Sequence, residues 1–345
     1  MGMLTTDTAV VRASTRVYGI LGYPVRHSVS PAMQTAAFRA CGLDAVYLAF
    51  EVAPKDLLTA LEGARALGLG GCNITIPHKY AAAKWCQRLS ADAETTFAVN
   101  TIVFDGGEAV GHNTDKTGFV RALSLTLGSD GKGVRALILG AGGVARAVVA
   151  GLVQAGAASV AVAARDRLRA EAMVADVCGR LAMHNTPASA PGGPASGLAG
   201  SASAPASPSS APGGPASAPT GAATCPVDII AWTEEALVTA CAEAELIVSC
   251  LPGEAAIPGL GSAGNLVPDA WPLGPSKRVF DVVYGSDTPL LRAAKLTGAS
   301  FTDGLEMLVQ QGAFAFELWT RRPAPVEVMR AAARTELTRR GAQGG

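Results

Sequence analysis

Residues 134 to 145 read VRALILGAGGVA. Apart from Arg135, the run from Val134 to Leu139 is apolar, which is typical of a strand buried on both faces of a parallel sheet. Gly140, Gly142 and Ala145 then follow with the GxGxxG/A spacing of a dinucleotide-binding turn, which requires a strand before it and a helix after it. The stretch therefore predicts a Rossmann-like unit with a pyrophosphate at the helix start. The groups that would hold this pyrophosphate belong to Gly140, Ala141, Gly142, Gly143 and Val144.

The end of the next predicted strand, 159 to 164, bears on the choice of dinucleotide. An acidic residue there accepts the ribose hydroxyls of NAD, whereas arginines hold the 2′-phosphate of NADP. Here Ala164 is followed by Arg165 and Asp166, and Arg169 lies four residues after Arg165. If a helix has begun at Arg165, the two arginines share one face. Asp166 either caps that helix, which we favour, or binds the ribose, so the sequence favours NADP over NAD.

Strands and helices alternate on both sides of this unit. Further strands are predicted in the same unit at 245 to 251 and 278 to 284, and a helix capped by Thr288 follows them. An earlier α/β unit contains a helix from 78 to 89, one capped by Ser30, and a hairpin around Asp105-Gly106-Gly107 that makes its sheet mixed. Its strands are predicted at 16 to 22, 45 to 52, 72 to 76, 98 to 104 and 108 to 113.

One segment interrupts the second unit. Between Pro187 and Pro219 every residue except Leu198 is Ala, Ser, Pro or Gly. Such a segment has no bulky apolar groups whose burial could offset the entropy of ordering. We therefore predict a disordered low-complexity insertion at 186–226.

The composition limits the partners. The formal net charge is zero, and 49% of the residues are hydrophobic. We expect a small-molecule partner, no nucleic acid and no membrane, because no basic excess and no apolar run of membrane-spanning length occurs. The seven cysteines and four histidines lack ligand spacing, which predicts reduced thiols and no metal. The cytoplasm is the expected location, and the chain is expected to be a monomer or a homodimer.

Polar residues gather at the ends of elements in the first unit. Asn73 and Thr75 alternate with apolar residues in the segment NITIPHK, which ends in Lys79. Such groups at the end of a buried strand are where α/β proteins hold ligands. Serine hydroxyls suit a carboxylate, amides suit hydroxyl groups, and a lysine near an aspartate can exchange a proton. The other clusters are Ser28 with Ser30, Asn100, and Asn113-Thr114-Asp115.

Together these motifs resemble the shikimate dehydrogenase family, in order and in approximate spacing. The resemblance runs from Tyr18 to about Trp319. It implies an NADP-dependent oxidoreductase that interconverts 3-dehydroshikimate and shikimate on the route to chorismate and aromatic amino acids. The segments that carry it are GYPVRHSVSP, NITIPHK, AVNT, HNTD, GAGGVA, FDVVY and DGLEMLVQQGAFAFELW.

The resemblance also implies an architecture. The fold class is α/β with two domains: an N-terminal mixed α/β substrate domain and a Rossmann-like dinucleotide-binding domain. The C-terminal helices return to the first domain. The substrate domain then comprises 15–118 plus 305–342, and the NADP-binding domain comprises 119–304.

The resemblance assigns roles to residues. Lys79 and Asp115 become the catalytic pair. Val282 and Gly304 fall where the backbone of the family lies against the nicotinamide. The residues expected around the substrate are Ser28, Ser30, Thr75, Lys79, Asn100, Asp115, Tyr284 and Gln311. Those expected around the cofactor are Gly140, Ala141, Gly142, Gly143, Val144, Ala164, Arg165, Asp166, Arg169, Val282 and Gly304.

Two alternatives stay open at this point. An NAD-preferring quinate/shikimate dehydrogenase differs only in the cofactor loop and in one substrate hydroxyl. Family members often have Asn-Arg-Thr where this chain has Ala164-Arg165-Asp166, so the loop does not exclude it. A ligand sensor without catalysis would be expected to lose Lys79 or Asp115, and both are present.

Overall fold

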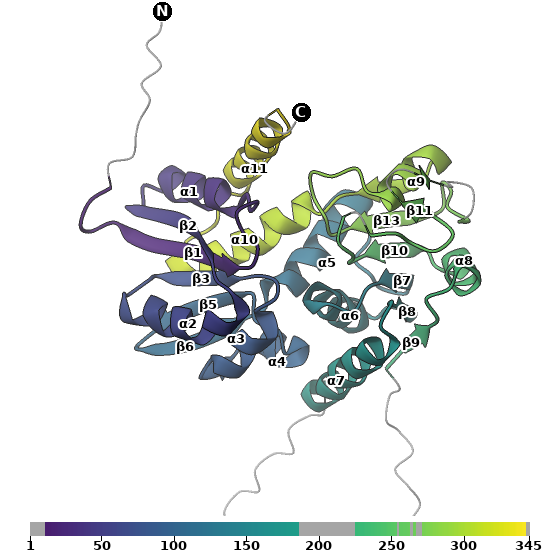
Figure 1. Cartoon of the computed structure of the whole chain (residues 1–345), viewed down its shortest axis with the longest axis horizontal. Coiled ribbons are helices and arrows are strands. Elements are labelled where there is room, and N and C mark those ends of the chain that lie inside the picture. The colour runs from purple at the N-terminus through teal and green to yellow at the C-terminus, as the bar shows by residue number, and fades with distance from the viewer. Residues whose placement is uncertain (1–10, 186–224, 254, 263–264, 267–270, 343–345) are drawn as a thin grey trace, which may run out of the picture.

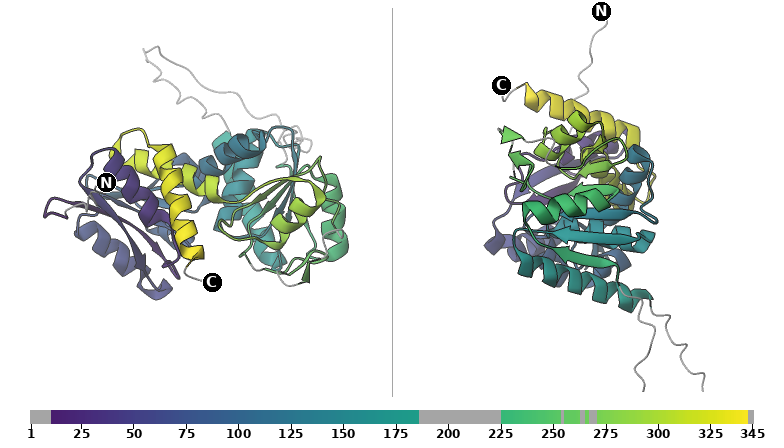
Figure 2. Two further views of the ribbon diagram at one scale, coloured as in Figure 1. Left: turned by 90° about the horizontal axis from the view of Figure 1, so that it is seen from above. Right: turned by 90° about the vertical axis from the view of Figure 1, so that its right-hand side faces the viewer.

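The computed structural model describes residues 11–342 apart from 186–224, 254, 263–264 and 267–270. Two six-stranded sheets organise the chain. They lie in separate lobes, with α5 (Thr114–Leu127) and α10 (Leu305–Thr320) between them (Figures 1 and 2). This confirms the predicted α/β fold with a mixed first sheet and a Rossmann-like second one.

The first sheet has the order β2-β1-β3-β5-β6-β4. β1 is parallel to β2 and β3, whereas β5 is antiparallel to β3 and to β6, as the Asp105-Gly106-Gly107 hairpin predicted. Its strands are β1 Arg16–Gly22, β2 Ala45–Glu51, β3 Gly71–Ile74, β4 Arg88–Leu89, β5 Thr101–Asp105 and β6 Glu108–His112. Its helices before α5 are α1 Ser30–Ala40, the 3-10 turn η1 Pro54–Asp56, α2 Leu57–Ala66, α3 Lys79–Trp85 and α4 Ala91–Thr96.

The second sheet is parallel throughout and has the order β14-β13-β10-β7-β8-β9, which is the Rossmann order read from its far edge. Its strands are β7 Arg135–Leu139, β8 Ser159–Ala163, β9 Val227–Ile230, β10 Leu246–Ser249, β13 Arg278–Asp281 and β14 Ser300–Thr302, and a short ribbon is formed by β11 Gly261–Ser262 and β12 Asn265–Leu266. The helices are α6 Gly143–Ala155, α7 Arg167–Asn185, α8 Glu234–Glu243, α9 Pro289–Thr297 and, after α10, α11 Val326–Gly341.

The central strand β7 is buried on both faces, as its apolar run predicted. Ala136 and Ile138 belong to the core on one side of the sheet, and Leu137 and Leu139 belong to the core on the other side. No polar residue interrupts these four positions because neither face meets water. The rigid strand fixes the point at which the glycine turn begins.

The last two helices return to the first domain. α10 packs against α5, and α11 packs against α1. Trp319 of α10 donates from its indole Nε1 to the carbonyl oxygen of Ile102 at 3.0 Å. A Cβ at Gly71 would lie 2.2 Å from that nitrogen, so only glycine lets β3 pass the indole ring. This packing anchors α10, which carries Gln311, beside the strand that leads to Lys79.

Several local predictions were wrong. β3 ends at Ile74 rather than at residue 76, and the side chain of Ile76 is 63% exposed. The helix predicted from 78 to 89 stops at Trp85, because Arg88 and Leu89 pair with β6. Ser30 is the first residue of α1 and not its cap. For α3, the pairing of β4 with β6 overrode local helix propensity.

The thiol prediction was also wrong in part, because Cys178 and Cys225 form a disulfide. Cys178 lies in α7 and Cys225 lies two residues before β9, the strand beside which α7 packs. Their Cα atoms are 5.8 Å apart although 47 positions separate them in sequence, so spacing alone gave no signal. Most of the predicted disordered insertion, 186–224, lies outside the described residues.

Candidate active site

Lys79 is placed by the turn that follows β3. His78 donates from its backbone to the carbonyl of Thr75 at 2.9 Å, and its ring Nε2 lies 2.8 Å from the carbonyl oxygen of Val52. Lys79 then opens α3, and its own carbonyl accepts from the backbone of Val99 at 3.0 Å. These bonds fix the lysine between the sheet and the loop before β5.

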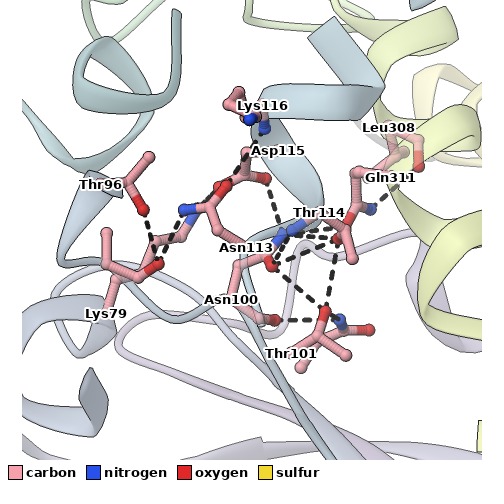
Figure 3. Close-up of polar contacts among 12 residues, drawn as sticks. Lys79, Thr96, Asn100, Thr101, Asn113, Thr114, Asp115, Lys116, Leu308 and Gln311 are labelled. Atoms are coloured by element: carbon pink, nitrogen blue, oxygen red, sulfur yellow. Dashed lines mark hydrogen bonds and ion pairs between the residues drawn. The ribbon is translucent and has the colours of Figure 1, made fainter. Parts of the chain in front are cut away.

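Asp115 meets Lys79 from the first turn of α5. Asn113 caps this helix, and its Oδ1 accepts from the backbone of Lys116 at 3.1 Å. The ammonium of Lys79 donates to Oδ2 of Asp115 at 2.6 Å (Figure 3), and both side chains are less than 10% exposed. A buried pair with this geometry is stable only when its remaining lone pairs are also hydrogen-bonded. The predicted pair is therefore brought together.

Asn100 supplies that further hydrogen bond. Its Nδ2 donates to Oδ1 of Asp115 at 2.8 Å and reaches Oε1 of Gln311 at 3.4 Å. Its Oδ1 accepts from the backbone of Thr114 at 2.8 Å. One amide thus links β5, α5 and α10, as Figure 3 shows. The sequence predicted Asn100 and Gln311 as site residues. Their hydrogen-bond partners became visible only in the folded structure.

Asn73 lines the cavity beside Lys79, but its amide is already bonded to protein groups. Its Oδ1 accepts from the hydroxyl of Tyr47 at 2.6 Å, and its Nδ2 donates to the carbonyl of Asn100 and to Oγ1 of Thr101. These bonds occupy both polar atoms of the amide. Asn73 therefore joins three strands instead of offering a free amide to ligand hydroxyls. Sequence reasoning missed Tyr47, because nothing in β2 marks a hydroxyl that reaches across β1.

A cavity of about 330 Å³ lies beside the Lys79–Asp115 pair. It brings together side chains from both domains, because the loops after β1, β3 and β13 and the start of α10 all face it. Ser28 and Ser30 are buried, and Ser28 Oγ accepts from the backbone of Ser30 at 3.2 Å. All the predicted substrate residues line this one cavity: Ser28, Ser30, Thr75, Lys79, Asn100, Asp115, Tyr284 and Gln311.

The opposite wall of the cavity is built from the second domain. Val144, Val282 and Gly304 line it. A Cβ at Gly304 would lie 2.0 Å from the carbonyl oxygen of Val282, and the Gly304 amide donates to the carbonyl of Val283 at 2.9 Å. The two backbone segments are therefore in direct contact, which only glycine permits, and they line the same cavity as Lys79.

The glycine turn has the geometry that a dinucleotide needs. Gly140 has φ of +111°, and a Cβ there would lie 3.1 Å from the carbonyl oxygen of Cys250. Gly142 precedes α6 with extended backbone, and Ala145 in the first turn of α6 is fully buried. A second cavity, of about 580 Å³, is lined by Ala141, Gly142, Gly143 and Arg169 among others. The residues present thus fit a pyrophosphate at the N-terminus of α6.

The loop after β8 holds the predicted ribose-proximal residues. Ala164 is buried, whereas Arg165, Asp166 and Arg169 are exposed. Oδ1 of Asp166 accepts from the backbone of Arg169 at 3.0 Å, so Asp166 caps α7 as we favoured. Because α7 begins at Arg167, Arg165 lies before the helix, and the condition for a shared helical face is not met. Arg165 and Arg169 nevertheless lie on either side of the capping residue, Asp166, in the sequence.

The described residues contain neither a cluster of metal-ligating side chains nor a membrane-spanning helix. No group of three or more His, Cys, Asp or Glu side chains in that part of the chain is arranged to hold a metal ion. No helix in it has the length and apolar character needed to cross a membrane.

Comparison with known proteins identifies the family. The family model described as shikimate dehydrogenase substrate binding domain matches residues 20–102, and the one described as shikimate 5'-dehydrogenase C-terminal domain matches 304–334. The NADP(+)-dependent shikimate dehydrogenase of Symbiobacterium thermophilum is 40% identical over 339 residues, which cover 97% of this chain and 99% of that protein. The chain belongs to the shikimate dehydrogenase family. The resemblance seen in the sequence motifs is confirmed.

Solved structures of the shikimate dehydrogenase fold support the same family assignment. The shikimate 5-dehydrogenase of Thermus thermophilus in complex with NADP(H) and shikimate aligns with a TM-score of 0.68 and 30% identity, covering 93% of this chain and 99% of that one. A quinate dehydrogenase from Corynebacterium glutamicum in complex with NAD aligns with a TM-score of 0.72 and 28% identity, covering 93% and 99%. Proteins with this fold therefore occur with either cofactor.

Proposed function

We propose that this chain is an NADP-dependent shikimate dehydrogenase that reversibly reduces 3-dehydroshikimate to shikimate. The single observation that carries the proposal is the 2.6 Å contact between Lys79 and Asp115, buried in a cavity that Val282 and Gly304 also line. A proton-transfer pair therefore faces a surface against which a nicotinamide can lie. Family membership supplies the substrate class.

Lys79 would act on the oxygen at C3 of the substrate. The bound NADPH supplies the hydride to the C3 carbon. The ammonium of Lys79 donates the proton to the C3 oxygen in reduction and takes it back in oxidation. Asp115 holds the ammonium in place, and Asn100 holds Asp115 through its second oxygen, so the donor is positioned before substrate enters.

The remaining cavity residues would orient the ring. Hydroxyls of Ser28, Ser30 and Tyr284 suit the carboxylate, because each can donate a hydrogen bond to an oxygen anion. The ring hydroxyls of the substrate can bond to both hydrogen-bond donors and acceptors, which belong to Thr75, Asn100 and Gln311. The two sets reach the cavity from different elements, Ser28 and Ser30 from the β1–α1 region and Asn100 from the loop before β5.

NADP is favoured over NAD by the loop after β8. Asp166 is engaged as the cap of α7, which leaves Arg165 and Arg169 as the charged side chains beside the expected position of the ribose. A capping carboxylate competes less well for ribose hydroxyls than a free one. The cytoplasmic location and the monomeric or homodimeric state stay predictions.

One assay tests the proposal. Purified protein is given shikimate or quinate, each with NADP or NAD, and formation of reduced nicotinamide is followed by absorbance. Turnover of shikimate with NADP at the highest kcat/KM of the four pairs is expected. Higher kcat/KM for quinate with NAD would support the quinate/shikimate alternative instead. No turnover of shikimate with either cofactor would overturn the proposal.

A further inference from the structure

The last turn of α11 reaches the loop that carries the substrate serines. Arg340 donates from Nη2 to the carbonyl oxygen of Ser28 at 2.8 Å and from Nη1 to the carbonyl oxygen of His27. Its Nε donates to Oε1 of Glu336 one turn earlier, at 2.7 Å. Each of the three nitrogens of the guanidinium therefore donates a hydrogen bond to a protein oxygen. Arg340 and Ser28 are 312 positions apart in the sequence.

This contact constrains the backbone on which Ser28 is mounted. A planar guanidinium that binds two successive carbonyls fixes the orientation of both peptide groups, which a lysine ammonium does less well. The amide of Ser28 is already bonded to the carbonyl of Val25 at 2.9 Å, and Oγ of Ser28 accepts from the amide of Ser30. Arg340 therefore completes the set of bonds that hold Ser28 in position.

The same turn of α11 also contacts the second domain. A Cβ at Gly285 would lie 2.8 Å from Cδ2 of Leu337, so α11 lies directly against the loop that follows Tyr284. Burial raises the pKa of Tyr284, and the nearby charge of Arg340 opposes this rise. Ser28 and Tyr284 approach the cavity from different domains, and α11 touches the backbone beside each of them.

We propose that Arg340 is a positioning residue. It holds Ser28 in the position, relative to the other cavity residues, at which Ser28 can bind the substrate carboxylate. This inference rests on the proposed function, since it concerns the substrate carboxylate. Arg340 acts through Ser28 and lies outside the lining of the cavity. It should therefore affect the binding of shikimate without affecting the proton-transfer pair or the cofactor.

Steady-state kinetics of Arg340→Met test the proposal. We expect the KM for shikimate to rise about 10-fold, as for the loss of hydrogen bonds from a charged donor. The kcat and the KM for NADP should stay within about twofold of the parent values, because neither involves this loop. Arg340→Lys, which keeps the positive charge but loses the planar guanidinium that binds two carbonyls, should give an intermediate KM.

Arg339→Met is the matched control, because Arg339 is the neighbouring residue and also pairs with Glu336. Its KM for shikimate should equal that of the parent. The decisive arm repeats Arg340→Met in a Ser28→Ala background, where the further rise in KM should be less than about twofold, since residues that act through one another are not additive. Thermal unfolding of every variant establishes that it is folded.

The outcomes separate two failures. If the parent protein turns over no shikimate, the proposed function falls. If the parent is active but Arg340→Met leaves the KM for shikimate unchanged, only the role of Arg340 falls. An equal rise in KM in the parent and the Ser28→Ala backgrounds overturns the role as well, because Arg340 would then not act through Ser28.

Discussion

The two sheets contribute to the site by opposite means. The first sheet presents buried side chains: the amide of Asn100 and the ammonium of Lys79 are held by hydrogen bonds of 2.6 to 2.8 Å. The second sheet presents backbone, and its key positions, Gly140 and Gly304, are those where a side chain has no room. The first domain is thus suited to distinguish the hydroxyls of a small substrate. The second is suited to approach a flat or charged cofactor closely.

This difference has an energetic consequence. A buried polar network loses function when one group is removed, because its partner is then left without a hydrogen bond. A close backbone contact loses function when a group is added, because packed interiors do not deform cheaply. Removing a polar group therefore tests the network of the first domain, and adding a methyl group tests the close backbone contact at Gly304.

The largest effect is expected for Lys79→Met. The kcat should fall by about 10²- to 10⁴-fold, as for the loss of a positioned acid, while NADP binding is retained. The fall is measured by steady-state turnover of shikimate, and NADP binding by fluorescence titration. The control is Lys84→Met, since Lys84 is exposed and its Nζ lies 4.6 Å from the ring centroid of Tyr80. Near-normal turnover of Lys79→Met would remove the lysine from the mechanism.

The unfolding free energy of the same variant separates chemistry from stability. Loss of Lys79 leaves the buried carboxylate of Asp115 without its cation, which costs about 3 to 5 kcal/mol. Adding Asp115→Asn should restore most of that stability, because no buried charge remains, but it should not restore turnover. A double variant that regains turnover would show that the pair serves only the fold.

The next effect is expected for Gly304→Ala, which adds one methyl group. Its Cβ would lie 2.0 Å from the carbonyl of Val282, so the backbone must move and the protein should lose about 1 to 3 kcal/mol of stability. The KM for NADP should rise, since both residues line the cavity wall. Gly63→Ala is the control: no atom lies within 4 Å of its added Cβ, and as a helical glycine it should gain about 1 kcal/mol. Unchanged stability and an unchanged KM for NADP in Gly304→Ala would refute the close contact.

A smaller effect is expected when Arg165 and Arg169 are both replaced by alanine. The kcat/KM with NADP should fall about 10- to 100-fold, in line with hydrogen bonds to a charged group, while that with NAD stays within about twofold. Arg167→Ala is the control, because Arg167 pairs with Glu171 instead. The ratio of the two kcat/KM values is the measurement. An unchanged ratio would assign the 2′-phosphate to other residues.

The smallest effect concerns the helices that join the domains. Arg330 of α11 binds both carboxylate oxygens of Glu306 of α10, at 2.8 and 2.7 Å, and lowers the pKa of Glu306 below its ordinary 4.5. A lowered pKa means that the carboxylate stabilises the fold above pH 4.5 and that this contribution is lost as the pH falls through the folded value. Glu306→Gln should therefore cost about 1 to 3 kcal/mol at pH 7, and progressively less as the pH falls through the lowered pKa of Glu306.

Urea unfolding of both proteins between pH 3 and 7 measures this difference. The control is Glu327→Gln, whose side chain also pairs with Arg330 but is 87% exposed, so its loss should be small at every pH. A difference between Glu306→Gln and the parent that did not shrink with falling pH would contradict the assigned role of the charge.

The sequence predicted most of the features that depend on the local pattern of apolar residues and glycines along the chain. The apolar run of β7 and the glycine turn that follows it are visible in the residue pattern and the glycine positions, and they were confirmed. The strands that were missed are only two to four residues long: β4, β9, β11, β12 and β14. Such short segments become strands through their neighbours, and their own residues carry little signal.

Side-chain partnership was decided by the tertiary structure. The sequence by itself determined the residue types available for chemistry: a lysine, an aspartate, paired serines and a glycine turn, each at the end of a predicted element. It did not show that Asn73 bonds to Tyr47, that Cys178 reaches Cys225, or that Arg340 binds the carbonyl of Ser28. The physical reason is range: local patterns report interactions within a few residues along the chain, whereas these contacts form between groups that only the packing of distant elements brings within hydrogen-bonding or covalent distance.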